Sequence, residues 1–270
     1  MLIINQCAAA LKNRPRRFIA PLILLVFIAG AFYLLFPRDD GTLAEIRQRG
    51  TLRVGLDASF PPFETFNGAG QIVGLDVDIA QAVADDLGVE LELVNIGFDG
   101  LYDALLARRA DLVISGLPYD PRWTQDVAYT LTYFNAGQVL VTLQGEATIQ
   151  QADDVAGRTV AVEWGSQADM EGRHLEEALE SVTLQRYPSA AEAIEAVLTN
   201  QVDAAIVDGV SAVGALPQGL HMVTYLTDEW YAAAVHIDSR ELLEVVNQTL
   251  IRLEESGEMA TMQAKWLRGE

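Results

Sequence analysis

The chain has 270 residues, of which 50% are apolar, and a formal net charge of −20 at pH 7. This length and apolar content predict one or two domains with a large core and exclude a disordered chain. The strong acidity argues against nucleic acid as a partner, because an acidic body repels a phosphate backbone.

The N-terminal part of the chain differs from the rest in charge. Residues 1–40 hold five of the 18 basic residues and only two of the 38 acids. Residues 18–36 contain no charge and would span roughly 28 Å as a helix, close to the thickness of the hydrocarbon core of a bilayer. Because basic residues precede this segment, we expect residues 1–17 to form a cytoplasmic stub and the body to lie outside the cytoplasm.

The segment 18–36 is therefore predicted to be an uncleaved transmembrane anchor, followed by a linker at residues 37–42. The alternative is a signal peptide cleaved near Ala29-Gly30-Ala31, which would release the body from the cell. Both readings place the body on the extracytoplasmic side.

Cysteine and histidine usage bears on metal sites and disulfides. One cysteine excludes an internal disulfide, and three histidines without ligand spacing argue against a histidine metal centre. We expect neither a metal nor a cofactor.

Strands and helices alternate through the first part of the body. Helices are predicted at residues 43–50, 75–87 and 100–109, and strands at 52–56, 89–93 and 111–115. The strand at 89–93 alternates apolar and polar residues, which is typical of a sheet edge. This order predicts a mostly parallel α/β sheet.

A second α/β set follows Tyr133-Phe134. Strands are predicted at 137–143, 158–163, 182–186 and 203–208, with helices from 165 to about 179 and over 189–198. An apolar run at 231–235 and helices from 239 to Leu267 complete the chain. We therefore expect two α/β lobes.

Two predicted strands end on an acid. The strand at 52–56 stops at Asp57, because Pro61-Pro62 cannot extend a central strand, and the strand at 203–208 ends on Asp208. In an open α/β sheet, ligands bind outside the carboxyl ends of the strands. The simpler alternatives are a surface acid at position 57 and a helix cap at position 208.

With these motifs in view, residues 43–269 resemble the extracellular solute-binding proteins of the polar-amino-acid type, which have the type II periplasmic-binding fold. The motifs that carry the resemblance are Arg53-Val54-Gly55-Leu56-Asp57, Phe60-Pro61-Pro62-Phe63, Val73-Gly74-Leu75-Asp76-Val77-Asp78-Ile79-Ala80, Phe98-Asp99-Gly100-Leu101, Asp111-Leu112-Val113-Ile114-Ser115-Gly116, Gly157-Arg158-Thr159-Val160-Ala161-Val162, Gly165-Ser166 and Val202-Asp203-Ala204-Ala205-Ile206-Val207-Asp208. The resemblance implies one lobe of residues 43–134 plus 232–270, a second of residues 138–228, and two hinge strands between them.

The resemblance also implies roles for individual residues. Asp208, assisted by Ser115, would hold the amino group of the ligand, and Asp57 would contact its far end. Phe60 and Phe98 would flank the ligand side chain. Backbone N–H groups near Gly116 and Leu117, and at Ser166 and Gln167, would hold a carboxylate; the second pair lies where a helix begins, which independently suits an anion.

The chain departs from the family pattern at the position of its carboxylate-binding arginine, eight residues after the serine. Trp123 occupies this position, and Arg122 lies one residue earlier. A shift of one residue rotates a helical side chain by about 100°, so either Arg122 replaces the family arginine through a changed loop or the arginine is missing. In the second case Phe60, Phe98, Tyr119, Trp123 and Trp164 would form an aromatic cage for a cation.

The expected function is capture of a small polar, amino-acid-like or cationic solute between the lobes, for delivery to the membrane permease of an ABC transporter. One alternative is a sensor that reports ligand occupancy to a membrane partner. The other is a dehydratase-like enzyme on the same fold. Glu163 is the available general acid for catalysis, but no second group pairs with it by spacing, so we expect no enzymatic activity.

Overall fold

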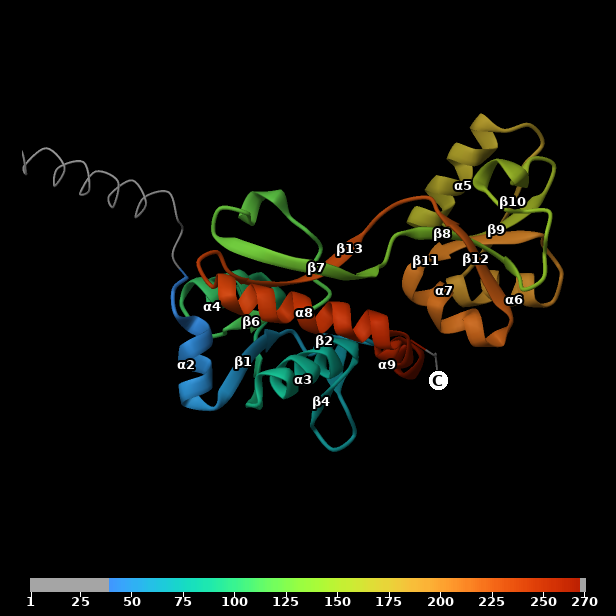
Figure 1. Ribbon diagram of the computed structural model, residues 1–270. Coiled ribbons are helices and arrows are strands. Elements are labelled where there is room, and N and C mark those ends of the chain that lie inside the picture. Colours follow the sequence, from blue (N-terminus) through green and yellow to red (C-terminus); the bar gives the residue numbers. More distant parts are fainter. Residues whose placement is uncertain (1–38, 268–270) are drawn as a thin grey trace, which may run out of the picture. The chain divides into compact units, whose positions relative to one another are not determined.

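The computed structural model describes residues 39–267, which contain two five-stranded sheets (Figure 1). Sheet 1 has the strand order β5-β1-β6-β13-β7, and sheet 2 has the order β10-β9-β11-β8-β12. We call the part around sheet 1 lobe 1 and the part around sheet 2 lobe 2. The predicted transmembrane segment 18–36 lies outside the described residues, and no helix within residues 39–267 is long and apolar enough to cross a membrane.

Lobe 1 is built from both ends of the described chain. Its strands are β1 (Thr51–Leu56), β5 (Glu90–Asn95), β6 (Leu112–Val113), β7 (Val127–Asn135) and β13 (Trp230–His236). Its helices are α2 (Thr42–Arg49), α3 (Leu75–Leu87), α4 (Leu101–Leu106), α8 (Arg240–Ser256) and α9 (Glu258–Trp266), with the short 3₁₀ helices η1 (Phe98–Gly100) and η2 (Pro121–Trp123). A small antiparallel sheet of β2 (Ser59–Phe60), β3 (Glu64–Phe66) and β4 (Ile72–Val73) lies between β1 and α3 in the sequence.

Lobe 2 is continuous in the sequence. Its strands are β8 (Gln138–Leu143), β9 (Thr159–Glu163), β10 (Thr183–Tyr187), β11 (Ala204–Asp208) and β12 (Leu220–Tyr225). Its helices are α5 (Gln167–Ala178), α6 (Ala190–Leu198) and α7 (Gly209–Ala215), with 3₁₀ helices η3 (Ala152–Val155) and η4 (Leu216–Gln218).

Both sheets mix parallel and antiparallel pairs. In lobe 1, β1 pairs in parallel with β5 and β6, whereas β13 runs antiparallel to β6 and β7. In lobe 2, β9 pairs in parallel with β10 and β11, whereas β8 runs antiparallel to β11 and β12. The prediction of a mostly parallel sheet in the first lobe is therefore wrong in its proportion, because two of the four strand pairings are antiparallel, and it holds for β5, β1 and β6. Strand β5 is at a sheet edge, as its alternation predicted.

Apolar cores cover both faces of each sheet, as expected for α/β layers. In lobe 1, residues of α3, α8 and β1, such as Ile79, Leu242 and Leu52, form the larger core, and α4 covers the opposite face through Leu101 and Leu105. In lobe 2, α6 and α7 pack on one face and α5 on the other. The parallel strands β5, β1 and β6 of lobe 1, and β10, β9 and β11 of lobe 2, thereby have their carboxyl ends at one edge of each sheet.

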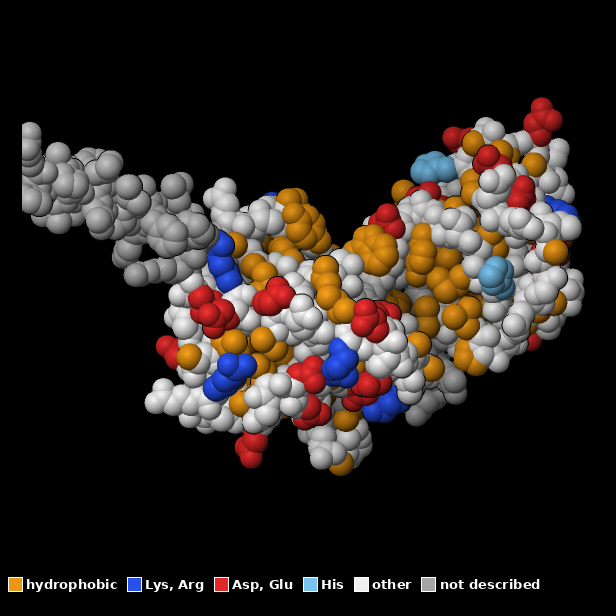
Figure 2. Space-filling view, in the orientation of Figure 1, with side chains coloured by type: hydrophobic (Ala, Val, Ile, Leu, Met, Phe, Trp, Pro, Cys, Tyr) orange, Lys and Arg blue, Asp and Glu red, His pale blue; other side chains and the backbone are white. Residues whose placement is uncertain are grey.

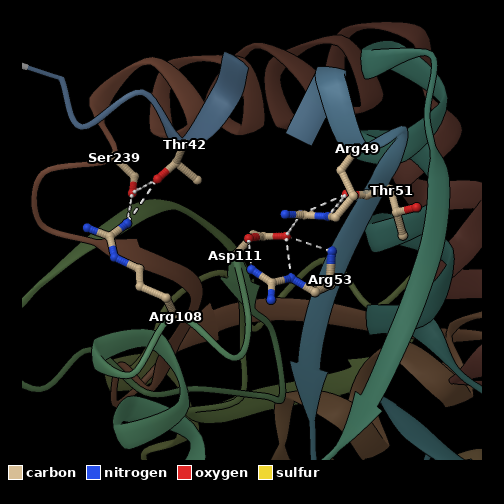
Figure 3. Close-up of polar contacts among 7 residues, drawn as sticks. All are labelled: Thr42, Arg49, Thr51, Arg53, Arg108, Asp111 and Ser239. Atoms are coloured by element: carbon tan, nitrogen blue, oxygen red, sulfur yellow. Dashed lines mark hydrogen bonds and ion pairs between the residues drawn. The ribbon is translucent and has the colours of Figure 1, made fainter. Parts of the chain in front are cut away.

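Polar contacts attach the first helix to the rest of lobe 1 (Figure 3). Asp111, before β6, accepts hydrogen bonds from the guanidinium groups of Arg49 and Arg53, the latter at 2.7 Å. Arg108 donates to the hydroxyls of Thr42 at 2.9 Å and Ser239 at 3.1 Å. These bonds join the start of α2, the start of α8 and the loop before β6.

Two chain crossings connect the lobes: β7 continues into β8, and β12 into β13 (Figure 1). Asn135 joins them, because its Oδ1 accepts the N–H groups of Gly137 and Glu229, both at 2.9 Å, and its Nδ2 donates to Asp228 at 2.9 Å. A Cβ at position 137 would lie 2.1 Å from the carbonyl oxygen of Thr227, so the close approach of the crossings requires glycine there.

Candidate functional site

The predicted site residues lie at the carboxyl ends of strands in both sheets. In lobe 1 they follow β1 and β6 or lie in η1 and η2: Asp57, Phe60, Phe98, Ser115, Gly116, Leu117, Arg122 and Trp123. In lobe 2 they end or follow β9 and β11: Glu163, Trp164, Ser166, Gln167 and Asp208. This edge is where open α/β sheets bind ligands.

Asp57 links the end of β1 to the neighbouring loops of lobe 1. Its Oδ2 accepts the N–H of Phe98 at 2.8 Å, and its Oδ1 accepts the hydroxyl of Ser59 at 2.7 Å. The N–H of Asp57 donates to Ser115 Oγ at 3.0 Å. Each carboxylate oxygen has a second acceptor position, and the side chain is only partly buried, so Asp57 can still bind a cationic group.

Two of the donors that the resemblance implied in the loop after β6 already have partners within lobe 1. Ser115 is buried and donates its hydroxyl proton to Glu64 Oε1 at 2.5 Å, and the N–H of Gly116 donates to Asp76 Oδ2 at 2.7 Å. Leu117 is fully buried. Both protons are thus taken by buried carboxyl groups inside lobe 1 in this structure, and the ligand contacts of Ser115 and Gly116 stay predictions.

Four of the five aromatic side chains of the predicted cage are exposed. Phe60, Phe98, Tyr119 and Trp164 have relative exposures of 41%, 44%, 56% and 75%. The ring of Phe60 is fixed from below, because it stacks on Phe63 with 5.3 Å between centroids and 11° between planes. Each exposed ring offers a face to a cation or an apolar group.

Arg122 and Trp123 point to different neighbours. The Arg122 side chain is 84% exposed and pairs with Asp120, with Nη2 at 2.6 Å from Oδ2. This pairing lowers the pKa of Asp120. Trp123 instead stacks on Tyr102, at 4.6 Å between centroids, and packs against the core under α4. Arg122 is therefore not arranged as the bidentate carboxylate clamp of the family pattern.

Asp208 forms the N-cap of α7. Its Oδ1 accepts the N–H of Ser211 at 2.9 Å, and its Oδ2 accepts the Ser211 hydroxyl at 2.7 Å. The helix-cap alternative is therefore correct as a description of these contacts. It does not exclude a ligand contact, since the side chain is partly exposed and each oxygen keeps an acceptor position.

The turn after β9 starts α5 and exposes Gln167. Ser166 is the N-cap: its Oγ accepts the N–H of Asp169 at 3.3 Å and donates to the carbonyl of Glu163 at 2.7 Å. Asp169 is buried below the turn and pairs with Arg173 and Arg186 at 2.6 Å and 2.9 Å. Burial raises the pKa of Asp169, but the two arginines and the N–H of Gly165 outweigh it, so the pKa is lowered.

Sequence reasoning missed two acids beneath the site, Glu64 and Asp76, both with no exposed surface. Burial, and then the charge of Asp76, raises the pKa of Glu64 to about 10. Burial also raises the pKa of Asp76 to about 6, against the lowering effect of its hydrogen bonds from Gly116, Glu64 and Tyr133. No sequence period marks Glu64, because β3 has only three residues and its exposure rises from the buried Glu64 to the exposed Phe66.

A groove of about 1000 Å³ is lined by residues of both lobes, but none of the predicted site residues is part of its lining. Pro61 and Pro62, which follow Phe60, line it from lobe 1, and Val210 and Ser211, which follow Asp208, line it from lobe 2. Trp266 of α9 contributes a further wall. The groove therefore shows a hollow between residues of the two lobes, and a cavity shared by the predicted site residues stays a prediction.

The surface around the lobes carries mainly acidic charge. Figure 2 shows Asp and Glu side chains spread among apolar ones over the face in view, as the excess of acids in residues 41–270 requires. Within residues 39–267, no group of three or more His, Cys, Asp or Glu side chains is placed to hold a metal ion.

Known proteins resemble this chain over nearly its whole length. The L-cystine-binding protein TcyJ of Escherichia coli K12 is 27% identical over 262 residues, covering 95% of this chain and 97% of that protein. The arginine-binding extracellular protein ArtP of Bacillus subtilis is 30% identical over 254 residues, covering 92% and 98%.

Two solved structures share the fold. An ancestral cationic amino acid solute-binding protein is 30% identical with a TM-score of 0.61, covering 84% of this chain and 99% of that one. An ancestral cyclohexadienyl dehydratase is 25% identical with a TM-score of 0.69, covering 87% and 98%. The model of the bacterial extracellular solute-binding proteins, family 3, matches residues 52–269, and the chain, with its two-lobed periplasmic-binding fold, belongs to this family.

Proposed function

We propose that the protein is a membrane-anchored, extracytoplasmic binding protein that captures a small cationic, amino-acid-like solute between its lobes and delivers it to an ABC-type permease. Relatives of 27% and 30% identity are named as cystine- and arginine-binding proteins, which supports an amino-acid-like ligand. Closure on the solute would follow from contacts that exist only in the closed state.

The observation that carries the proposal is the pair Asp57 and Asp208. They follow or end β1 and β11, belong to different lobes, and are both partly exposed with acceptor positions left. The exposed ring of Phe60 follows Asp57 in the sequence, and the exposed ring of Trp164 follows β9, the strand next to β11. A cation between two carboxylates and aromatic faces gains both Coulomb and cation–π attraction.

The test is isothermal calorimetry of the full chain in detergent with arginine, lysine, histidine, cystine, putrescine and glycine betaine. We expect saturable binding of at least one cationic compound, and weaker binding at higher ionic strength. The matched control is Glu90→Gln, which removes an exposed acid at the opposite, amino end of β5. Folded protein that binds none of these compounds would refute the proposal.

A second candidate ligand is a cation without an α-carboxylate, because Arg122 is paired with Asp120 and turned to solvent. Arginine and agmatine decide between the candidates, since they share the guanidinium group and differ in the carboxylate. Agmatine binding as tightly as arginine would establish a site that does not recognise the carboxylate. Arginine binding more than tenfold tighter would show that another donor, such as the start of α5 at Ser166, holds the carboxylate.

The alternatives of sensing and catalysis have their own tests. A transporter subunit is expected to co-purify with a permease, whereas a sensor would co-purify with a signalling protein. For catalysis, Glu163 is the candidate acid. We expect no turnover of prephenate-like cyclic acids, and turnover that is lost in Glu163→Gln would reverse this assignment.

The anchor at residues 18–36 is part of the proposal. An uncleaved chain has a mass of 29.4 kDa and stays in the membrane fraction after alkaline carbonate washing. A smaller, soluble product beginning near residue 32 would instead establish a cleaved signal peptide.

A further inference from the structure

Two fully buried carboxyl groups lie beneath the loop after β6 that contains Ser115 and Gly116, which we call the binding loop of lobe 1. Glu64 of β3 and Asp76 of α3 both have no exposed surface. Glu64 Oε1 accepts the hydroxyl of Ser115, and Asp76 Oδ2 accepts the N–H of Gly116 at 2.7 Å and the hydroxyl of Tyr133 at 2.9 Å. The pair thus contacts two consecutive residues of the predicted site.

The remaining oxygens of the pair lack ordinary donors. Glu64 Oε2 and Asp76 Oδ1 are buried and have no hydrogen-bond partner among the described residues. The charge of Asp76 raises the pKa of Glu64, so the neutral form of one of the two buried carboxyl groups is favoured. Asp76 already accepts two donors, which favours its ionised form, so the proton belongs on Glu64.

The surroundings of the pair contain no balancing positive charge. The titratable groups that face it are Asp57 at the end of β1, Tyr133 of β7 and Tyr231 of β13. No Lys, Arg or His within residues 39–267 forms a hydrogen bond or an ion pair with either carboxyl group. Two ionised carboxylates here would be strongly disfavoured.

We propose that Glu64 and Asp76 share one proton and that this pair positions the binding loop. Because the hydroxyl proton of Ser115 goes to Glu64, its oxygen is left to accept the N–H of Asp57. Because Asp76 holds the N–H of Gly116, this glycine stays at φ +50° against the ring of Phe60. The pair touches no ligand and acts through these three residues.

A shared proton makes unfolding pH-dependent in one direction. Glu64 ionises near its ordinary value of 4.5 in the unfolded chain and only near 10 in the folded one. Between these values unfolding releases its proton, so stability falls as the pH rises. Asp76 adds the same effect between its ordinary value of 3.8 and about 6.

The experiment compares three variants of the full chain in detergent. Glu64→Gln supplies a permanent N–H donor to Asp76 and keeps an oxygen for Ser115. Asp76→Asn removes the charge that holds the Gly116 N–H. Asp78→Asn is the control, since it removes a partly exposed acid of the same helix that bonds Lys265 and Trp266.

Three readouts follow. On urea unfolding at pH 8, Glu64→Gln is expected to release about one proton fewer than the parent, and Asp78→Asn the same number as the parent. In Asp76→Asn, hydrogen exchange of the Gly116 amide is expected to be at least tenfold faster. With L-arginine as probe, Asp76→Asn is expected to raise Kd at least tenfold, while Glu64→Gln changes it less than threefold at pH 7.

Equal proton release from parent and Glu64→Gln would overturn the shared proton. Unchanged exchange at Gly116, or unchanged arginine affinity, in Asp76→Asn would overturn the positioning role. Of the tests of the positioning role, only the arginine measurement rests on the proposed function. A parent that shows the proton release and the Gly116 protection but binds no arginine would therefore count against the proposed ligand and not against the pair.

Discussion

Replacing Gly116 by alanine tests whether the loop after β6 holds the Phe60 ring in place. The backbone of Gly116 has φ +50°, which costs an L-residue roughly 1–2 kcal/mol. A Cβ there would lie 2.6 Å from Phe60 Cε1 and 3.0 Å from Cδ1. The ring is 41% exposed and can turn away, at the loss of its stacking on Phe63, worth about 0.5–1.5 kcal/mol.

We therefore expect Gly116→Ala to lower the free energy of unfolding by about 1.5–3.5 kcal/mol. If Phe60 faces a bound cation, losing that contact removes a further ~0.5–2 kcal/mol of binding, or roughly two- to thirtyfold in Kd. The measurements are urea unfolding for stability and calorimetry with the best ligand of the screen for affinity.

The matched control is Gly70→Ala. Gly70 has φ +76°, and a Cβ at this position would have no other atom within 4 Å, so the variant carries the backbone cost of about 1–2 kcal/mol without a clash. Gly70→Ala should leave Kd unchanged. Equal stability losses and equal affinities for the two variants would refute the reasoning, because they would show that Phe60 is not displaced or does not matter.

Three further predictions concern single side chains. Arg122→Ala should change the free energy of unfolding by less than about 0.5 kcal/mol, because an exposed ion pair contributes little. Trp123→Ala should lower it by about 2 kcal/mol through lost stacking and burial. Chemical denaturation measures both, and a large loss for Arg122→Ala alone would contradict the assigned contacts. Asp208→Asn should keep the cap on Ser211 and still weaken cation binding at least tenfold, while Asp208→Ala should in addition cost about 1 kcal/mol of stability. Calorimetry measures the binding role and urea unfolding the capping role. Unimpaired binding in both variants would show that Asp208 is not part of the site. Asp169 has a lowered pKa, so its stabilising contribution is present above its ordinary value of 3.8 and is lost as the pH falls through its lower folded value; Asp169→Asn should cost about 1–3 kcal/mol at pH 7 and less in acid, and a pH-independent difference would show that its charge is not what stabilises the turn.

The sequence patterns predicted those parts of the fold that have a clear period or a clear stop. The apolar run Leu52, Val54 and Leu56 is fully buried in β1, and Gly88 ends α3 in the left-handed conformation. The positions of Asp57 and Asp208 at strand ends were predicted because an apolar run that stops at a charged residue can be recognised in the sequence itself. The helix predicted to 109 ends earlier, at Leu106, since Arg108 adopts a positive φ.

Other elements had no readable period. The strands β2, β3 and β4 have two or three residues each, too few for an alternation to appear. The long strand β7 mixes exposed and buried positions because it is at the edge of sheet 1, and α7 contains two glycines, which weaken a helical pattern.

The hydrogen-bond partners of the site residues could not be predicted from the sequence. Ser115 was expected to face a ligand, but its partner Glu64 is 51 residues away, and the Phe98 N–H that Asp57 binds is 41 residues away. Such pairings depend on the tertiary structure and on which group carries a proton. The orientation of Arg122 likewise depends on Asp120, two residues before it, which competes with any ligand carboxylate.

The strand order of sheet 1 has a consequence for folding during synthesis. Strand β13 lies between β6 and β7, yet it emerges from the ribosome after all of lobe 2 has been made. Lobe 2, by contrast, is complete once β12 has appeared. During synthesis and export, β6 and β7 must therefore wait unpaired at their facing edges until residues 230–236 arrive, so the earlier-made half of the first lobe is the segment most in need of chaperones.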